Sequence, residues 1–424
     1  MVGRVMESLS QDPDVIVIGA GAAGLSAAKA LRAAGLVTNV LEAANHVGGR
    51  CVTDTTTFST PFDRGGSWMH SANINPLARQ AEAVDARLHK TEWSLTAAHC
   101  FDRTLEGEDF ADYSAYEDVI WNVASGVKEG TVDTTVDAAL PFSPWKAPAK
   151  HLISTMDGAD ADMISLHDTA AYDWGDDSDW LVEGGYGAFV ARMHADVPVK
   201  CGCPVTEIRH GGATPEVVTP EGTLSAEQVV VTVSTGVLGA ERIRFEPSLP
   251  VDTLRAIDQL PNGLLNKVGI EFDPVWQEAV LGDRFDFHAN SDQFVTLFFG
   301  FYGTGLATGF IGGRCADQLE QDGPGAATAL CRDSLRSFFG SDIEKMILKT
   351  TETAWRSDPL TLGSYSYAKP GGAGARQMLA TPVNDRLFFA GEATMPHSYS
   401  TVHGAWLSGQ RVAQEILAVR SKGN

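Results

Sequence analysis

The chain has 424 residues, of which 44% are hydrophobic and 20% are charged, the composition of a soluble globular protein. Its 54 acidic and 32 basic residues give a formal net charge of −22, which argues against nucleic acid as a partner and favours the approach of a small cationic molecule. We find no uninterrupted apolar run of about 18 residues and no apolar leader segment, so we expect neither a membrane span nor a secretory signal peptide.

The length of the chain bears on its domain organisation, and its cysteines bear on the cellular compartment. A chain of 424 residues is too long for one compact core, so two interleaved domains are expected, with residues 1–11 as a flexible leader. The six cysteines are scattered, and the closest pair, Cys201 and Cys203, lacks the CxxC spacing of zinc or redox sites. We therefore predict free thiols, a cytoplasmic location and no metal site. The oligomeric state is left open.

Residues 14–50 predict a strand–helix–strand unit. An apolar strand, Val15–Ile18, runs into a glycine-rich turn, a helix follows over residues 25–34, and a second strand over residues 36–41 ends at Glu42. The N-terminus of such a helix presents free N–H groups to a phosphate. Glu42 lies about 20 residues beyond the turn, where a carboxylate accepts hydrogen bonds from a ribose and disfavours a 2′-phosphate. The unit therefore predicts a site for a dinucleotide other than NADP.

The glycines of this unit have separate tasks. Gly19 permits the tight turn, Gly21 lets a pyrophosphate approach the backbone, and Gly24 lets helix and strand pack closely. The sequence Val47-Gly48-Gly49-Arg50 extends the phosphate site and supplies a cation. With these motifs the chain resembles the FAD-containing flavoproteins with two dinucleotide-binding domains, and in particular the flavin amine oxidases. The resemblance implies FAD as the cofactor.

Two stretches further along offer groups for a substrate. Gly65-Gly66-Ser67-Trp68-Met69-His70 is similar to a stretch of animal-type polyamine oxidases, which implies that His70 lies near the substrate amine and hydrogen-bonds it or takes its proton. A purely structural histidine is the alternative. An acidic run before Gly184 could bind distal cationic groups, although a solvated loop is the favoured interpretation. The run contains Asp173, Asp176, Asp177, Asp179 and Glu183.

The next pattern is a buried strand over residues 228–233 that ends at a turn and leads into a crossover. It resembles a segment of polyamine oxidases and histone lysine demethylases, with Ser234-Thr235 replacing Pro-Leu. Lys267 follows among apolar residues at the start of a strand, and lysines are rarely buried unless they are paired or functional. The resemblance implies that Lys267 holds a water against flavin N5. The alternative is a lysine that reaches solvent from the strand edge.

Residues 363–367 alternate tyrosine and serine after a glycine, which predicts a strand with aromatic side chains on one face. The resemblance places the ring of Tyr365 beside the substrate, where it would suit an amine, and the alternative is a tyrosine in a domain core. Monoamine oxidases carry a cysteine at the position of Ser364, and that cysteine bonds the flavin. Because a hydroxyl cannot form this thioether, non-covalent FAD is predicted.

The C-terminal part begins with a buried strand and a Gly391-Glu392 turn, and a loop then leads into a helix that ends near residue 419. Small residues let this helix approach a flat ring, and its N-terminal N–H groups would face the pyrimidine end of a flavin. The resemblance implies that Glu392 hydrogen-bonds the ribityl chain or ribose and that Val402 presents its backbone to the ring. Monoamine oxidases have a second tyrosine beside the substrate at the position of Thr401, and the absence of that ring implies a more open pocket.

The expected fold is α/β, a Rossmann-like FAD fold with two dinucleotide-binding domains, interleaved with an α+β substrate domain of a mixed sheet plus helices. We expect the FAD-binding domain to comprise residues 12–85, 186–265 and 370–424, and the substrate domain to comprise residues 86–185 and 266–369. The expected catalytic residues are Lys267, His70 and Tyr365, and the expected substrate pocket adds Thr401 and Glu183. The expected cofactor-binding residues are Gly19, Gly21, Ala23, Gly24, Glu42, Gly49, Arg50, Gly66, Ser67, Trp68, Val205, Trp355, Gly391, Glu392, Thr401 and Val402.

The resemblance implies an FAD-dependent amine oxidase that converts a primary or secondary amine, of polyamine type, to an imine or aldehyde, with O2 as acceptor and H2O2 as product. A monoamine oxidase acting on arylalkyl amines and an L-amino-acid oxidase are alternatives on the same fold. A histone demethylase is disfavoured because the chain has no heptad run for a helical tower. A flavin-binding protein without turnover is the alternative from another class.

Overall fold

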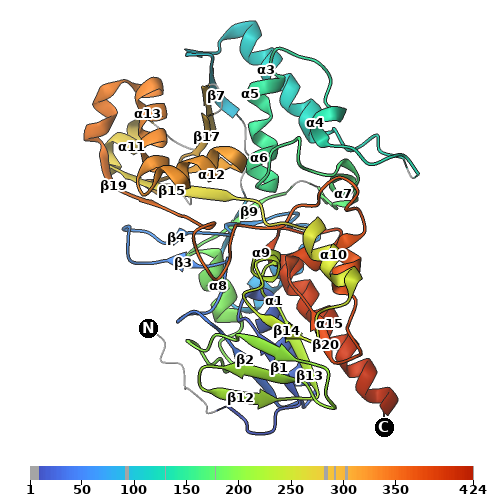
Figure 1. The fold of residues 1–424 in the computed structure, drawn as a ribbon. Helices are drawn as coiled ribbons and strands as arrows, with labels where there is room; N and C mark the ends of the chain where they lie inside the picture. Colours follow the sequence, from blue (N-terminus) through green and yellow to red (C-terminus); the bar gives the residue numbers. More distant parts are fainter. Residues whose placement is uncertain are drawn as a thin grey trace.

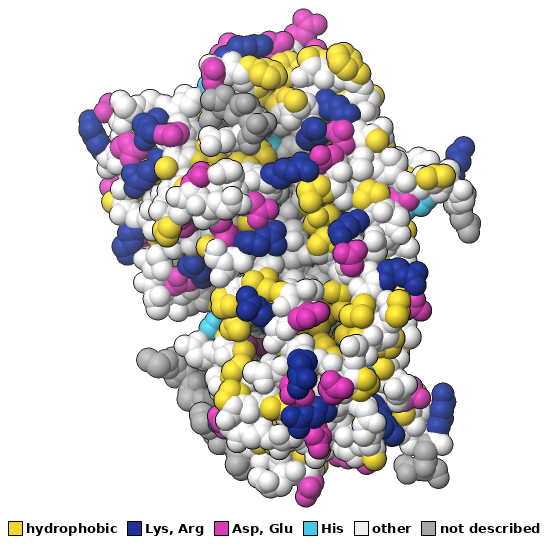
Figure 2. All heavy atoms as spheres, viewed as in Figure 1, with side chains coloured by type: hydrophobic (Ala, Val, Ile, Leu, Met, Phe, Trp, Pro, Cys, Tyr) yellow, Lys and Arg dark blue, Asp and Glu magenta, His cyan; other side chains and the backbone are white. Residues whose placement is uncertain are grey.

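The computed structural model describes residues 9–90, 95–128, 130–176, 178–280, 285–290, 293–300 and 304–423. Figure 1 shows two lobes, the lower one holding the N-terminal strands, the C-terminal helix and strands from the middle of the chain, and the upper one holding the stretches around residues 95–157 and 265–352. Lys and Arg side chains are interspersed with Asp and Glu over the face drawn in Figure 2.

The lower lobe is built on a four-stranded parallel sheet with the order β2-β1-β13-β20. The short apolar strands are buried along their length, as expected for a parallel sheet covered on both faces. Segments far apart in the sequence thus become neighbours: Ile16 is opposite Asn39 and Val229, and Val229 is opposite Leu387. The strands are β1 (Val15–Ile18), β2 (Thr38–Leu41), β13 (Gln228–Val231) and β20 (Leu387–Phe389).

The strand β1 shows how the sheet is covered, because its side chains alternate between two cores. Val15 and Val17 face one core together with α1 (Ala22–Ala33), α8 (Tyr186–Met193) and α15 (Val402–Gly423), while Ile16 and Ile18 face the other. The second core is closed by a mixed sheet with the order β12-β11-β10-β14, in which only β10 and β14 pair in parallel, and by short helices. These elements are β10 (Glu207–Arg209), β11 (Glu216–Thr219), β12 (Gly222–Ser225), β14 (Arg244–Glu246), α9 (Thr235–Gly239), α10 (Val251–Gln259), α14 (Ala375–Ala380) and the 3-10 helix η3 (Glu392–Thr394).

The upper lobe contains a seven-stranded sheet with the order β19-β15-β18-β17-β16-β7-β8. It is mixed, as predicted, because β16 and β7 are parallel while the other neighbours are antiparallel. Helices α12 and α13 share a core with β15, β17 and β18. The elements are β7 (Leu95–Cys100), β8 (Arg103–Thr104), β15 (Leu265–Phe272), β16 (Phe285–Asn290), β17 (Gln293–Phe298), β18 (Leu306–Gly312), β19 (Ile347–Glu352), α11 (Pro274–Val280), α12 (Gly313–Asp322), α13 (Ala326–Phe339) and the 3-10 helix η2 (Ser341–Lys345).

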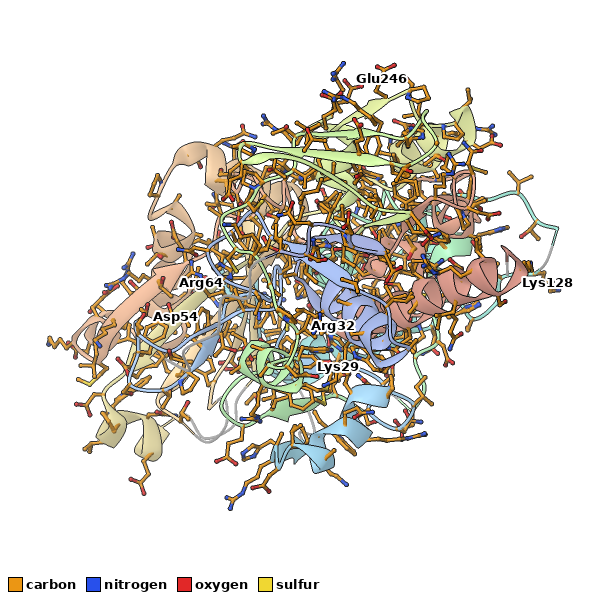
Figure 3. All side chains as sticks on the ribbon, turned by 90° about the horizontal axis from the view of Figure 1, so that it is seen from below. Lys29, Arg32, Asp54, Arg64, Lys128 and Glu246 are labelled. Carbon is orange, nitrogen blue, oxygen red and sulfur yellow. The ribbon has the colours of Figure 1, made fainter. Side chains whose placement is uncertain are left out.

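Short helices and two small sheets complete the chain. The small sheets are β3-β4 and β5-β9-β6, and the first is flanked by an ion pair of 3.7 Å between Arg64 and Asp54, both labelled in Figure 3. The strands are β3 (Thr53–Asp54), β4 (Phe62–Asp63), β5 (Trp68–Met69), β6 (Leu88–Lys90) and β9 (Trp180–Val182). The helices are α2 (Pro76–Ala83), α3 (Gly107–Trp121), α4 (Val136–Ala139), α5 (Lys146–Ala149), α6 (His151–Asp157) and α7 (Leu166–Ala171).

The predicted strand over residues 363–367 is wrong. The segment makes only an isolated bridge between Asn262 and Ser366. Its serine hydroxyls bond elsewhere: Ser364 Oγ accepts from the Leu265 N–H, and Ser366 Oγ–H donates to Glu392. Such local polar side chains compete with ladder hydrogen bonds and leave the segment irregular.

Two further points concern the ends of the chain and membranes. Residues 1–8 of the predicted leader lie outside the described residues, whereas Ser10 exchanges two hydrogen bonds of 3.0 Å with the Asn39 side chain.

Among the helices described, none has the length and apolar character needed to cross a membrane.

Candidate active site

The turn between β1 and α1 has the geometry of a phosphate-binding loop. Gly19 has φ +102° and donates its N–H to Leu41 O at 2.8 Å. A Cβ on Gly24 would lie 2.0 Å from Gly19 O, so only glycine permits this approach of helix to strand. Beside Gly21 the nearest atom to a Cβ would be 3.8 Å away, so the N-terminus of α1 is open to a ligand.

Glu42 and Arg50 lie next to this turn. Glu42 Oε2 accepts the Ala20 N–H at 2.6 Å and Oε1 accepts the Ala44 N–H at 2.8 Å, so its carboxylate is fixed at the end of β2. Arg50 Nη1 donates to Ser364 O at 2.8 Å and to Glu392 Oε1 at 3.0 Å. Glu42 thus supplies an anion and Arg50 a cation, the groups that suit a ribose and a pyrophosphate respectively.

A cavity opens at the carboxyl ends of the parallel strands, where ligands bind in open α/β sheets. It lies beside the Arg50–Glu392 ion pair and is bordered by the residues that follow β13 and β20. The lining residues are Arg50, Val231, Val233, Ser234, Thr235, Leu238, Leu379, Phe389, Ala390, Gly391, Glu392, Ala393 and Thr394. The lining offers the Arg50 guanidinium and the hydroxyls of Ser234 and Thr235, and groups of these kinds bind the phosphate and ribose of a dinucleotide.

Lys267 lies buried on β15, with 3% of its side chain exposed. Its Nζ donates to Asp63 O at 3.2 Å, to Gly65 O and to Ser67 Oγ at 2.5 Å, which uses all three ammonium protons. Burial lowers the Lys267 pKa to about 8, against the opposing charge of Asp63. In this structure the lysine therefore binds the end of β4 and the residues that follow it, up to Ser67, by direct hydrogen bonds.

His70 pairs with Asp179. Nδ1 of His70 donates to Asp179 Oδ1 at 3.0 Å, and the residues meet because Met69 is opposite Trp180 in the pairing of β5 with β9. Burial lowers the His70 pKa, but the Asp179 charge and hydrogen bond outweigh burial, so the net pKa is raised. The charge of Lys267 also acts on this pKa, which indicates that the pair and the lysine share one site.

His403 is the second histidine at this site, and its pKa is shifted in the direction opposite to that of His70. Asn75 Nδ2 donates to His403 Nδ1 at 3.2 Å and to the carbonyl of His70 at 2.9 Å. Burial, and then the charge of His70, lower the His403 pKa to about 4. His403 is therefore neutral at ordinary pH, and of the two histidines it is His70 whose pKa is raised.

Tyr365 is one of three tyrosines near a carboxylate that sequence reasoning missed, Asp157 at the end of α6. Tyr365 donates its hydroxyl to Thr155 O at 2.9 Å, and the rings of Tyr172 and Tyr399 meet at 5.2 Å. Burial raises the pKa of each tyrosine, and the charge of Asp157 raises it further. Burial, and then the charge of Asp168, raise the Asp157 pKa to about 7.

The structure brings other predicted residues to the same place. Trp68 contacts Phe310 at a ring distance of 5.1 Å beside Lys267, and Val402 Cγ2 would lie 2.7 Å from a Cβ on Gly66. Trp355 Cζ2 would lie 3.4 Å from a Cβ on Gly65. Thr401 Oγ1 accepts the Gly404 N–H at 2.9 Å, which caps the start of α15. Gly49 lies beside Gly21 of the glycine turn, and Gly391 lines the cavity. Ala23 is on α1 and is buried in the core that this helix covers.

Two predicted residues lie elsewhere. Glu183 is exposed, and its N–H donates to Arg87 O at 2.9 Å, beyond the end of β9 that pairs with β6. From the same acidic run it is Asp179 that meets His70, and Asp177 lies outside the described residues. Val205 is buried in the core that the sheet β12-β11-β10-β14 closes.

Comparison with known proteins agrees with this geometry. The family model described as flavin containing amine oxidoreductase matches residues 145–417, and that of the NAD(P)-binding Rossmann-like domain matches residues 17–81. The chain therefore belongs to the flavin containing amine oxidoreductase family, which implies a flavin cofactor. The predicted fold and family resemblance are confirmed.

Among its relatives, the chain is 31% identical to polyamine oxidase 4 of Oryza sativa subsp. japonica, over 98% of this chain and 91% of that protein. It is 30% identical to lysine-specific histone demethylase 1 homolog 2 of Arabidopsis thaliana, over 96% of this chain. The chain spans 58% of the length of that demethylase and 52% of a rice homologue.

Solved structures share the fold. Putrescine oxidase bound to putrescine has a TM-score of 0.80 at 22% identity, covering 96% of this chain and 99% of that one. Cyclohexylamine oxidase from Brevibacterium oxydans has a TM-score of 0.80 at 24% identity, covering 97% of this chain and 100% of that one.

Proposed function

We propose that the protein is an FAD-dependent oxidase of a cationic amine, of polyamine type, and that it forms an imine or aldehyde and releases H2O2. The observation that carries the amine specificity is the contact of the Tyr172 and Tyr399 rings at 5.2 Å, with the carboxylate of Asp157 close enough to act on both tyrosines and that of Asp179 on Tyr172. Tyrosine rings with carboxylates nearby suit an alkylammonium group through cation–π and ionic contacts. The cytoplasmic location stays a prediction.

The residues around Lys267 and His70 supply the protein's part of the reaction. Bound FAD would accept a hydride from the carbon next to the amine nitrogen and pass two electrons to O2. An alkylamine has a pKa of about 10, so its ammonium must lose a proton before the lone pair can assist. Neutral His70 accepts that proton, and Asp179 stabilises the resulting imidazolium. Lys267 holds a positive charge in a dry site.

We infer that FAD binds without a covalent bond. Ser364, which directly precedes Tyr365, is buried, and its hydroxyl accepts the Leu265 N–H at 2.8 Å. Two features separate the alternative substrates. A carboxylate clamp for amino acids would require an accessible arginine, whereas Arg376 beside Tyr399 is fully buried and paired with Asp168. The likeness to histone demethylases makes a methyl-lysine peptide the second candidate.

The test is anaerobic reduction of the purified flavoprotein followed by a peroxide assay. The panel holds putrescine, spermine, acetylated polyamines, benzylamine, L-amino acids and a dimethyl-lysine peptide. We expect diamines or polyamines to bleach the flavin and air to restore its colour with peroxide release. Bleaching by benzylamine, amino acids or the peptide in place of polyamines would assign the corresponding alternative. A flavin that none of these amines bleaches would contradict the proposal.

A further inference from the structure

A buried chain of alternating charges runs from the core of the molecule to the proposed flavin site. Asp168 binds Arg376 Nε at 3.0 Å and Nη2 at 2.8 Å, and Arg376 Nη1 donates to Ser366 Oγ at 2.9 Å. Ser366 Oγ in turn lies 2.7 Å from Glu392 Oε2, and Glu392 Oε1 binds Arg50. The side chains of all but Arg50 are at least nine-tenths buried.

The direction of each hydrogen bond in this chain is fixed by chemistry. An arginine has only donors, so the Ser366 hydroxyl must accept from Arg376. The single hydroxyl proton of Ser366 is then free to point at one acceptor, and it meets the Glu392 carboxylate. Arg376 thus orients Ser366, and Ser366 orients Glu392.

Arg376 has few ways to relax from this position. Its side chain is 0% exposed, Asp168 binds one edge of the guanidinium, and the Tyr399 ring lies 3.7 Å from Cζ. Burial of either charge alone would be strongly unfavourable. Burial lowers the Arg376 pKa, but Asp168 outweighs burial and raises it, so the guanidinium stays charged.

The same chain of contacts joins segments of the predicted substrate domain to segments of the predicted FAD-binding domain. Asp168 is on α7, Ser366 follows directly after Tyr365, and Arg376 is on α14. Ser400, which precedes α15, links Glu392 to Ser366 a second time. Its N–H donates to Glu392 at 3.0 Å, and its hydroxyl donates to Ser366 O at 2.7 Å. The backbone on one side of Tyr365 is therefore tied to the carboxylate of the flavin site.

We propose that Arg376 is a positioning residue that, through Ser366, fixes the Glu392 carboxylate for flavin binding and couples the flavin site to the placement of Tyr365. This inference rests on the proposed function, because it assumes that Glu392 binds the flavin. Asp168 serves as the fixed anchor of the arginine.

The test measures FAD affinity and apoprotein stability separately. Ser366→Ala removes the directing hydroxyl and leaves the Asp168–Arg376 pair intact, and Ser334→Ala is the matched control, because Ser334 is also 0% exposed and donates its hydroxyl to Leu330 O. A lost hydrogen bond to a charged group predicts FAD binding about tenfold weaker for Ser366→Ala, by flavin fluorescence titration. The apoprotein melting temperature should fall below that of the control, because Arg376 and Glu392 each lose a hydrogen bond, and the FAD titration is therefore compared at a temperature where both apoproteins are folded.

Arg376→Lys keeps the positive charge but loses the fork that binds Asp168 and Ser366 together, so it should weaken FAD binding in the same direction. FAD binding as tight as wild type in both variants would overturn the inference. So would an FAD affinity that falls no further for Ser366→Ala than for Ser334→Ala, which would assign the serine to core stability alone. Wild-type protein that binds no flavin would instead refute the proposed function.

Discussion

His70 and Asp179 lie 109 residues apart in the sequence, yet Nδ1 of the histidine is 3.0 Å from Oδ1 of the aspartate. The antiparallel pairing of β5 with β9 places Met69 opposite Trp180, so the residues just beyond each strand face one another. The aspartate raises the pKa of a histidine whose burial would lower it. The pair thus sets the pH at which the proposed base changes charge.

Asp179→Asn should move the His70 limb of the kcat/KM profile to lower pH, by about one to two units, because the stabilising charge is lost while burial remains. The pair also stabilises the fold below the unfolded pKa of about 6.5, and that contribution disappears as pH rises through the raised folded pKa. The melting temperature of the variant should therefore fall below wild type at pH 5 and approach it at pH 9. An unmoved kinetic limb would reject the role of Asp179.

Lys267→Met should leave FAD bound and slow turnover on the order of 100-fold, because a buried cation that stabilises developing negative charge is lost. Lys349→Met is the control, since that lysine lies on the neighbouring strand β19 and donates to Thr57 O from an exposed position. Stopped-flow reduction and reoxidation give the two half-reactions separately. Equal rates in wild type and Lys267→Met would discard the proposed role.

Asp157→Asn should raise the KM of diamines about tenfold while leaving that of benzylamine unchanged, because only the former carries a distal cation. The Asp157 pKa of about 7 adds a pH signature: affinity for diamines should fall as pH drops through 7 and the carboxyl becomes neutral. Asp162→Asn changes an acidic residue whose side chain is 51% exposed and serves as the control. Equal losses for both amines would contradict the assignment.

The local parts of this site could be predicted from sequence, and the long-range parts could not. The β1–α1–β2 unit and Lys267 are visible because glycine spacing and a lysine among apolar residues are local signals. The Asp168–Arg376 pair joins residues 208 positions apart, and nothing in the spacing indicates it. Asp179 was predicted only within an acidic run, because the register of β9 decides which carboxylate meets His70. The irregular segment at Tyr365 follows from serine hydrogen bonds that a two-residue alternation does not reveal.

Acid precipitation of the holoprotein should release all of its flavin into the supernatant, because the Ser364 hydroxyl at the position of the linking cysteine cannot form a thioether. Absorbance near the flavin band in the pellet and in the supernatant measures the distribution. Flavin colour that stays with the precipitate would contradict non-covalent binding.

Gly24→Ala should weaken FAD binding at least tenfold and lower the free energy of unfolding by about 1–3 kcal/mol, because the added Cβ would lie 2.0 Å from Gly19 O and must push α1 away from β1. The displaced helix would carry its N-terminal N–H groups away from the phosphate position, so the two effects should appear together. Gly126→Ala is the control, because a Cβ there meets nothing within 4 Å and the change in stability should stay within about 0.5 kcal/mol. Urea denaturation of the apoproteins and FAD titration measure the two quantities, and a Gly24→Ala protein that matches Gly126→Ala in both would show that the close packing of this turn does not govern cofactor binding.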